Sequence, residues 1–185
     1  LTNYCNLNCK WCAIDRTKKK ENLDKNLLEK ILKNLVFDRR FKNIRSIRLW
    51  CFGEPLLHPD FVEILKIIKE YKQMALEKNI KFPKIMLSTN MTLLDKDLSK
   101  KIVDLEILNE IRFSIGGGSK EKFEEIRKGA KWERVYKNLL DFKKINKGKI
   151  KTTIVCIIDN KEYGTNFMTK EFKSILEEEI KKSKS

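Results

Sequence analysis

The sequence predicts an α/β fold in which parallel strands alternate with helices. Three observations support this. Short β-rich runs alternate with amphipathic segments of helical period, the connections between them are short, and only seven Gly and three Pro occur among 185 residues. Such an alternation implies βαβ units with right-handed crossovers. These units can build either a doubly wound open sheet or a TIM-type barrel.

Five segments are predicted to be strands. The segment EIRFSI shows the pattern most clearly, because Ile111, Phe113 and Ile115 fall on one face while Arg112 and Ser114 fall on the other. The other runs are apolar or β-branched and end at turn residues. The predicted strands cover residues 1–4 (the end of a strand), 44–52, 84–88, 110–115 and 150–158.

Helices are predicted between these strands, with apolar residues at helical spacing. We expect Asp95 to be an N-cap, and two helical pieces to be divided near Gly129. The apolar faces of the helices fall within residues 28–35, 61–68, 98–105, 132–142 and 172–180.

The polar and chemically active residues follow the predicted strands. A cysteine loop follows the first, FGEP the second, STN the third, Ser114 with Gly116–Gly118 the fourth, and Asp159 with Asn160 the fifth. In both architectures, functional sites lie at the carboxyl ends of parallel strands. We therefore expect these five loops to meet at one rim.

The cysteine loop reads CNLNCKWC and places Cys5, Cys9 and Cys12 within eight residues. Thiolates bind zinc, copper(I) or iron–sulfur clusters. A structural zinc site needs four ligands, for which Cys51 or His58 would be a distant fourth. A 4Fe–4S cluster held by three cysteines keeps one iron open to another ligand, as a reaction site requires.

The spacing C-x3-C-x2-C with an aromatic residue before the last cysteine resembles the radical S-adenosylmethionine (radical SAM) enzymes. The resemblance continues in FGEPLLHPDF, in LSTNMTLL, and in IRFSI followed by KFEEIRKGAKWERVYKNLL, so that it covers residues 1–160. It implies a partial TIM-type (β/α) barrel, with about five of the family's usual six βα units visible. Residues 1–185 would then be a single core domain, incomplete at its N-terminus and C-terminus.

The resemblance also implies a reaction. Cys5, Cys9 and Cys12 would hold a 4Fe–4S cluster whose open iron binds S-adenosylmethionine. Reductive cleavage of the sulfonium would give a 5′-deoxyadenosyl radical that takes a hydrogen atom from a substrate. The cofactor would carry this chemistry, and the protein would position the reactants and exclude water.

The resemblance implies roles for nine further residues at the cofactor site. An aromatic side chain would flank the adenine or shield the cluster, and the Gly-Glu-Pro segment would receive the cofactor's amino group. The Ser-Thr-Asn turn would line the rim near the methionine or ribose, the serine of the fourth strand would bind the ribose or carboxylate, and the arginine would bind the carboxylate. These residues are Trp11, Gly53, Glu54, Pro55, Ser88, Thr89, Asn90, Ser114 and Arg127. The sequence departs from the family pattern at Phe52, Met91 and Gly116, where the family often has Gly, Gly and Asp.

The substrate is expected to be a peptide or protein, because GEPLLHPDF and KFEEIRKGAKWERV look like the SPASM-type peptide-modifying subgroup. A low-potential donor such as flavodoxin or ferredoxin would reduce the cluster. The sequence contains no run of 18 apolar residues, so no membrane-spanning helix is expected. We expect no signal peptide, and the odd number of cysteines, three of them clustered, favours the cytoplasm.

Two alternatives stay open. The formal net charge of +15 is compatible with a nucleic-acid partner, and a zinc-stabilised basic nucleic-acid-binding module is the second hypothesis. It lacks a recognised binding motif, and the lysines are spread along the chain. The third hypothesis is an inactive radical SAM fragment that folds but does not cleave S-adenosylmethionine.

Overall fold

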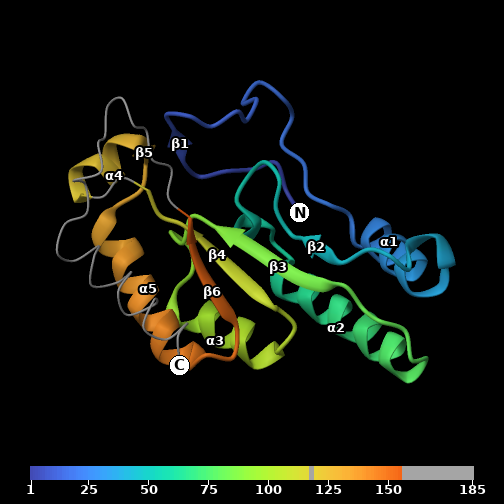
Figure 1. Ribbon diagram of the computed structural model, residues 1–185. Coiled ribbons are helices and arrows are strands. Elements are labelled where there is room, and N and C mark those ends of the chain that lie inside the picture. The colour runs from blue at the N-terminus through green and yellow to red at the C-terminus, as the bar shows by residue number, and fades with distance from the viewer. Residues whose placement is uncertain (117–118, 156–185) are drawn as a thin grey trace.

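The centre of the molecule is a four-stranded parallel sheet (Figure 1). The computed structural model describes residues 1–116 and 119–155. The strands are β2 (Ser46–Arg48), β3 (Lys84–Thr89), β4 (Glu110–Ser114) and β6 (Lys151–Val155), in the order β2-β3-β4-β6. Leu87 of β3 pairs with Ile111 of β4, which pairs in turn with Thr152 of β6.

Four helices form one layer on this sheet. They are α1 (Lys25–Phe37), α2 (Phe61–Glu77), α3 (Lys96–Leu105) and α5 (Trp132–Asn146). Each contacts the next, α1 with α2, α2 with α3 and α3 with α5, so that the helices follow one another on one side of the sheet (Figure 1). A doubly wound sheet would carry helices on both faces. The fold is therefore an open portion of a TIM-type barrel, as predicted; within residues 1–116 and 119–155 the sheet does not close.

The core lies between the sheet and the helices. Ile85, Leu87, Ile111 and Phe113 of the central strands are fully buried on this side, and the Phe113 ring meets the edge of Phe142 from α5 at 5.3 Å between centroids. Because side chains alternate along a strand, the opposite face carries the intervening residues. These are partly exposed and mostly polar, and they include Arg48, Trp50, Ser88, Arg112 and Ser114.

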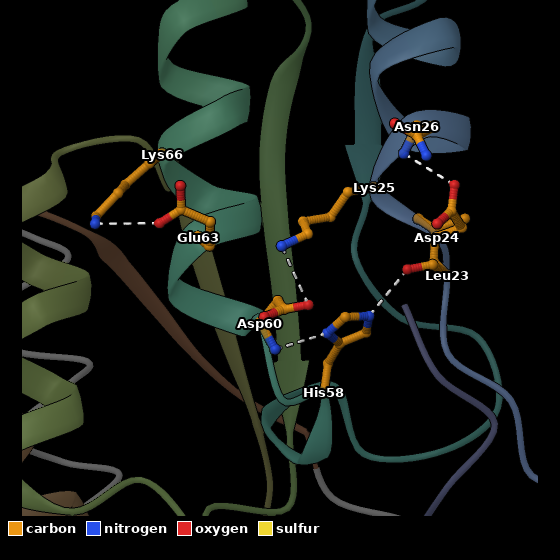
Figure 2. A network of polar contacts seen from close by, with 8 residues as sticks. All are labelled: Leu23, Asp24, Lys25, Asn26, His58, Asp60, Glu63 and Lys66. Atoms are coloured by element: carbon orange, nitrogen blue, oxygen red, sulfur yellow. Dashed lines mark hydrogen bonds and ion pairs between the residues drawn. The ribbon is translucent and has the colours of Figure 1, made fainter.

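His58 joins the beginnings of α1 and α2 (Figure 2). The Asp60 backbone N–H donates to His58 Nδ1 at 3.1 Å, and Nε2 lies 3.1 Å from the Leu23 carbonyl oxygen. The acceptor role of Nδ1 assigns the proton to Nε2, which then donates to Leu23. Lys25 adds an ion pair of 3.5 Å with Asp60. The histidine therefore has a structural role, joining the segment before α1 to the start of α2.

Further predicted boundaries are confirmed. Asp95 is the N-cap of α3, and its side chain accepts a hydrogen bond from the Leu98 backbone N–H. The helical region around Gly129 is divided, with α4 (Lys120–Ile126) and α5 separated by the two-residue strand β5 (Arg127–Lys128). Short 3-10 helices occur at Arg39–Phe41 and Pro55–Leu57. No helix among the described residues is long and apolar enough to cross a membrane.

The prediction of a strand at residues 1–4 is wrong. Thr2 makes only an isolated antiparallel bridge with Asn22, and the segment packs against Gly53 instead of joining the sheet. The first strand of the chain is β1 (Asn8–Cys9), inside the cysteine loop. Several predicted features lie outside the described residues, namely Gly117, Gly118, the strand beyond Val155, Asp159, Asn160 and the helix at 172–180.

Candidate functional site

The cysteine loop is attached on one side to β5. Strand β1 pairs antiparallel with β5, so that Asn8 faces Lys128 and Cys9 faces Arg127. The Lys10 backbone N–H adds a hydrogen bond of 2.8 Å to the Ile126 carbonyl oxygen. This pairing fixes the middle of the loop beside the chain that follows α4.

The other side of the loop is attached to the turn after β3. The Asn6 side chain donates to Thr92 Oγ1 at 2.8 Å and accepts from the Asn90 side chain at 3.0 Å. Asn90 Oδ1 also accepts from the Thr92 backbone N–H and hydroxyl. Asn90 therefore joins the cysteine loop to this turn, and its contact with a ligand stays a prediction.

The three clustered thiols line one cavity at the carboxyl ends of the strands. The cavity contains ten of the twelve residues predicted for the site: Cys5, Cys9, Cys12, Gly53, Glu54, Ser88, Thr89, Asn90, Ser114 and Arg127. Leu7, Trp50 and Cys51 complete it. Two of the predicted residues do not line the cavity. They are Trp11, which is 39% exposed, and Pro55, which begins the 3-10 helix.

Position 53 requires a glycine, because the backbone that leads to Cys5 passes close to it. Its φ is +98°, and a Cβ atom placed on it would lie 2.3 Å from the Thr2 carbonyl oxygen and 2.6 Å from that of Tyr4. The neighbouring Glu54 backbone N–H donates to the same Tyr4 oxygen. The close approach that only glycine permits is therefore made to residues 2–4 of the protein itself.

Glu54 is buried beneath the cavity, with 2% of the residue exposed. Its Oε1 accepts from the Thr89 hydroxyl at 2.8 Å and the Leu56 backbone N–H at 3.2 Å, and its Oε2 accepts from the Asn90 backbone N–H at 2.7 Å. Burial raises the pKa of Glu54, although these hydrogen bonds oppose the rise. The carboxylate thus connects the FGEP and STN turns through these hydrogen bonds.

Arg127 gives the cavity a positive charge beside the thiols. It is 9% exposed, its Nη1 lies 3.9 Å from Cys9 Sγ, and its Nε has no hydrogen-bond partner among the described residues. Burial raises the pKa of the Cys9 thiol, and the charge of Arg127 opposes that effect. The sequence assigned Arg127 to a helical stretch, but it belongs to β5, where the antiparallel pair with Cys9 directs it to the site.

The donor set suits an iron–sulfur cluster, because three thiols line the cavity and thiolates are the ligands that hold such clusters. A structural zinc site would need a fourth ligand. Both ring nitrogens of His58 are engaged elsewhere, so His58 is excluded as a fourth ligand. The orphaned Nε of Arg127 also suits a negatively charged group in the cavity.

Met91 follows Asn90 in the STN turn, at a position where the family often has glycine. Its φ is +64°, a left-handed conformation that favours glycine, yet its side chain is fully buried. The Asn138 side chain donates a 2.7 Å hydrogen bond to the Met91 carbonyl oxygen. The turn therefore forms without glycine. The methionine that departs from the family pattern contributes a buried side chain to the core.

Trp50 is the residue of the cavity that sequence reasoning missed most clearly. Strand alternation places residues 48, 50 and 52 on one face, opposite the buried Leu49. The corresponding faces of β3 and β4 carry Ser88 and Ser114, whose hydroxyl oxygens are 3.4 Å apart. Combining the pattern of these three strands would have placed Trp50 beside the two serines.

Comparison with known proteins identifies the class of this fold and site. The family model described as the Radical SAM superfamily matches residues 1–168, and the chain belongs to this family. A structure described as native anSMEcpe with bound AdoMet aligns with a TM-score of 0.74 and 25% identity, covering 94% of this chain and 46% of that one. A second anSMEcpe structure, with AdoMet and the Kp18Cys peptide, gives a TM-score of 0.74 and 26% identity over the same shares.

Two further relatives agree with this assignment. Streptococcus suis SuiB bound to S-adenosylmethionine has the same fold, with a TM-score of 0.56 and 17% identity over 98% of this chain and 46% of that one. The tungsten-containing aldehyde ferredoxin oxidoreductase cofactor-modifying protein of Pyrococcus furiosus is 29% identical over 108 residues, which are 58% of this chain and 27% of that protein. The chain thus spans less than half of these relatives. Membership of the family implies a 4Fe–4S cluster and S-adenosylmethionine as cofactors.

Proposed function

We propose that this chain is the catalytic core of a radical SAM enzyme, in which Cys5, Cys9 and Cys12 hold the 4Fe–4S cluster. The observation that carries the proposal is the convergence of these three thiols in one cavity with the turns after β2, β3 and β4. Once bound, the cluster and S-adenosylmethionine supply a one-electron reduction and a carbon-centred radical. The protein's own residues hold, orient and shield these groups.

Arg127 has two roles in this proposal. Its positive charge beside Cys9 compensates the negative charge of thiolate ligands. Its unused Nε donor is available for the carboxylate of S-adenosylmethionine, since guanidinium groups bind carboxylates well. Ser88 and Ser114 lie on the open face and supply hydroxyl groups for the ribose or carboxylate.

Other residues support the site indirectly. Glu54, Thr89 and Asn90 form hydrogen bonds with one another and with the cysteine loop. Gly53 packs against the backbone that leads to Cys5. These residues position the loop and the floor of the cavity. Trp11 remains a candidate for shielding the cluster, because it directly precedes Cys12. Pro55 begins the 3-10 helix for which Glu54 is the N-cap.

We further propose that the substrate is a peptide, in the manner of the SPASM-type subgroup. The likeness to anSMEcpe with a bound peptide supports this, at 26% identity. An acidic low-potential carrier such as flavodoxin or ferredoxin is proposed as the electron donor. Cys12 is exposed, and a basic group of exposed side chains lies along the same loop, namely Lys10, Lys18, Lys19 and Lys20. We propose a cytoplasmic location, because the cysteines that hold the cluster must stay reduced.

The test is electron paramagnetic resonance of anaerobically reconstituted, dithionite-reduced protein, with and without S-adenosylmethionine. A 4Fe–4S signal that changes on addition of the cofactor, with formation of 5′-deoxyadenosine, is expected. A cluster signal that ignores the cofactor would indicate the inactive fragment.

A matched cysteine variant separates the cluster from zinc. Cys51→Ala should keep the iron content of the wild type, whereas Cys9→Ala should lose most of it. Zinc lost from both variants, with no iron in the wild type, would instead favour the zinc-stabilised module, with Cys51 as its fourth ligand.

A further inference from the structure

Two arginines and a tryptophan form a cluster on the open face of the sheet, beside the cysteine cavity. Trp50 lines that cavity, and its ring centroid lies 5.8 Å from the Arg48 guanidinium and 5.7 Å from that of Arg112. Arg48 belongs to β2 and Arg112 to β4, so the cluster spans the strand β3 that lies between them. We call Arg48, Trp50 and Arg112 the arginine–tryptophan cluster.

The cluster has unused hydrogen-bonding capacity. Among the described residues, the Arg48 side chain makes no hydrogen bond or ion pair, and its contact is with the Trp50 ring. In the same part of the chain, the Arg112 side chain donates only from Nε, to Glu110 Oε1 at 2.8 Å, which leaves both terminal nitrogens for another acceptor. A cation–π contact with an aromatic ring does not use the N–H donors of a guanidinium, so these donors stay available for an acceptor.

Among the described residues, the charge around the cluster is positive. Glu110 is the acidic side chain of this part of the chain that contacts the cluster, and it is already shared by Arg112, by the Thr153 hydroxyl at 3.0 Å and by Lys151 at 3.9 Å. Two cations, Arg112 and Lys151, therefore share one carboxylate, and Arg48 adds a further positive charge to the cluster. The register places Glu110 level with Lys151, and Arg112 level with Ser88 and Thr153, so these groups share the open face.

We propose that the arginine–tryptophan cluster binds a carboxylate of the peptide substrate and thereby holds a neighbouring residue at the cavity. The inference rests on the proposed function, because it takes the substrate to be a peptide, whose anionic groups are carboxylates. A guanidinium group binds a carboxylate bidentately, and Trp50, which both arginines contact, lines the cavity proposed as the reaction site.

The test measures binding of fluorescein-labelled peptides to the anaerobically reconstituted protein by anisotropy. The probes are a C-terminally amidated peptide with one central Glu, the same peptide with Gln, and the Gln peptide with a free C-terminal carboxylate. Measurements are made in 0.15 M NaCl, where the Debye length of about 8 Å limits attraction by the distant basic surface.

The variants are Arg48→Gln and the double variant Glu110→Gln/Arg112→Gln, which removes Arg112 without leaving Glu110 unpaired. The matched control is Arg45→Gln, because Arg45 is also exposed but precedes β2 at the opposite end of the sheet. We expect the wild type and the control to prefer a carboxylate peptide over the amidated Gln peptide. Each cluster variant should weaken that binding about tenfold, as for loss of a charge-assisted hydrogen bond.

The two carboxylate peptides show whether a side chain or the C-terminus is recognised, and either result supports the proposal. Equal binding of all three peptides to the wild type would overturn it. So would an unchanged preference in both cluster variants, or an equal loss in Arg45→Gln, which would show attraction by general surface charge. Cleavage of S-adenosylmethionine is assayed separately, so that failure of the proposed function is distinguished from failure of this inference.

Discussion

The Glu54 carboxylate accepts a 2.7 Å hydrogen bond from the backbone N–H of Asn90 and thereby joins the turns that follow β2 and β3. Its other oxygen accepts from the Thr89 hydroxyl and the Leu56 N–H. Asn90 in turn holds Asn6 of the cysteine loop. One buried carboxylate thus connects the floor of the cavity with the loop that carries the thiols.

Glu54→Gln is expected to destabilise the protein by about 1–3 kcal/mol, the typical cost of leaving a buried donor unsatisfied. All three partners of Glu54 donate, so an amide NH2 in place of either oxygen meets another donor. Urea unfolding at pH 7 measures the change. Glu29→Gln, on the exposed side of α1, is the control and should be neutral. Equal midpoints for both variants would show that the bonds to Glu54 contribute no net stability.

Gly53→Ala is expected to disturb both folding and cluster assembly. The added Cβ meets the carbonyl oxygens of Thr2 and Tyr4 at less than a normal contact distance, and these belong to backbone that leads directly to Cys5. Gly148→Ala is a matched control, because Gly148 also has a positive φ (+83°) but has no atom within 4 Å of the new Cβ. The control should lose about 1–2 kcal/mol from backbone strain alone.

Thermal unfolding and the iron content after reconstitution distinguish the two alanine variants. Gly53→Ala should unfold at a lower temperature than Gly148→Ala and retain less iron per chain, because the displaced segment carries a cluster ligand. If both variants kept full iron content and the same unfolding temperature, the contact between Gly53 and residues 2–4 would be irrelevant to the site.

The alternation of strands and helices could be predicted because it depends on local hydrophobic patterns. The predicted core strands at 84–88 and 110–115 correspond to β3 and β4, and Asp95 caps α3 as expected. The choice between a barrel and a doubly wound sheet could not be made from these patterns, because it depends on which face each helix covers.

The features that could not be predicted are short backbone pairings and contacts that leave no hydrophobic periodicity in the sequence. Strands β1 and β5 have two residues each, too few for any periodic signal, yet their pairing brings Arg127 beside Cys9. Residues 1–4 resembled a strand but serve as the backbone against which Gly53 packs. Motif resemblance located Glu54 correctly at the cavity, while its hydrogen bonds within the protein required the three-dimensional structure.

Met91→Gly is expected to destabilise the protein even though glycine suits the left-handed backbone at this position. Relief of strain contributes about 1–2 kcal/mol, whereas removal of a fully buried methionine side chain costs about 2–5 kcal/mol. Lys147→Gly, at an exposed residue with φ of +46°, removes similar strain without losing burial and should not destabilise. Chemical denaturation of both variants compares the two effects, and a more stable Met91→Gly protein would show that strain outweighs packing.

Glu110→Gln is expected to reduce stability in a pH-dependent way. Burial alone would raise the pKa of Glu110, but hydrogen bonds from Arg112 and Thr153, with the charges of Arg112 and Lys151, hold it below its ordinary value. A carboxyl whose pKa is lowered by folding stabilises the protein above its unfolded pKa, about 4.3, and loses that contribution as the pH falls through the folded value.

At pH 7 the wild type should therefore exceed Glu110→Gln by about 1–2 kcal/mol in the free energy of unfolding, since hydrogen bonds to a charged group are replaced by weaker ones. Urea denaturation between pH 7 and pH 3 should show the two proteins converging in the acid range, where Glu110 becomes protonated. Glu29→Gln supplies the pH control, because its exposed side chain makes no comparable contacts. A difference that stayed constant down to pH 3 would mean that the shape of the side chain, and not its charge, stabilises the open face of the sheet.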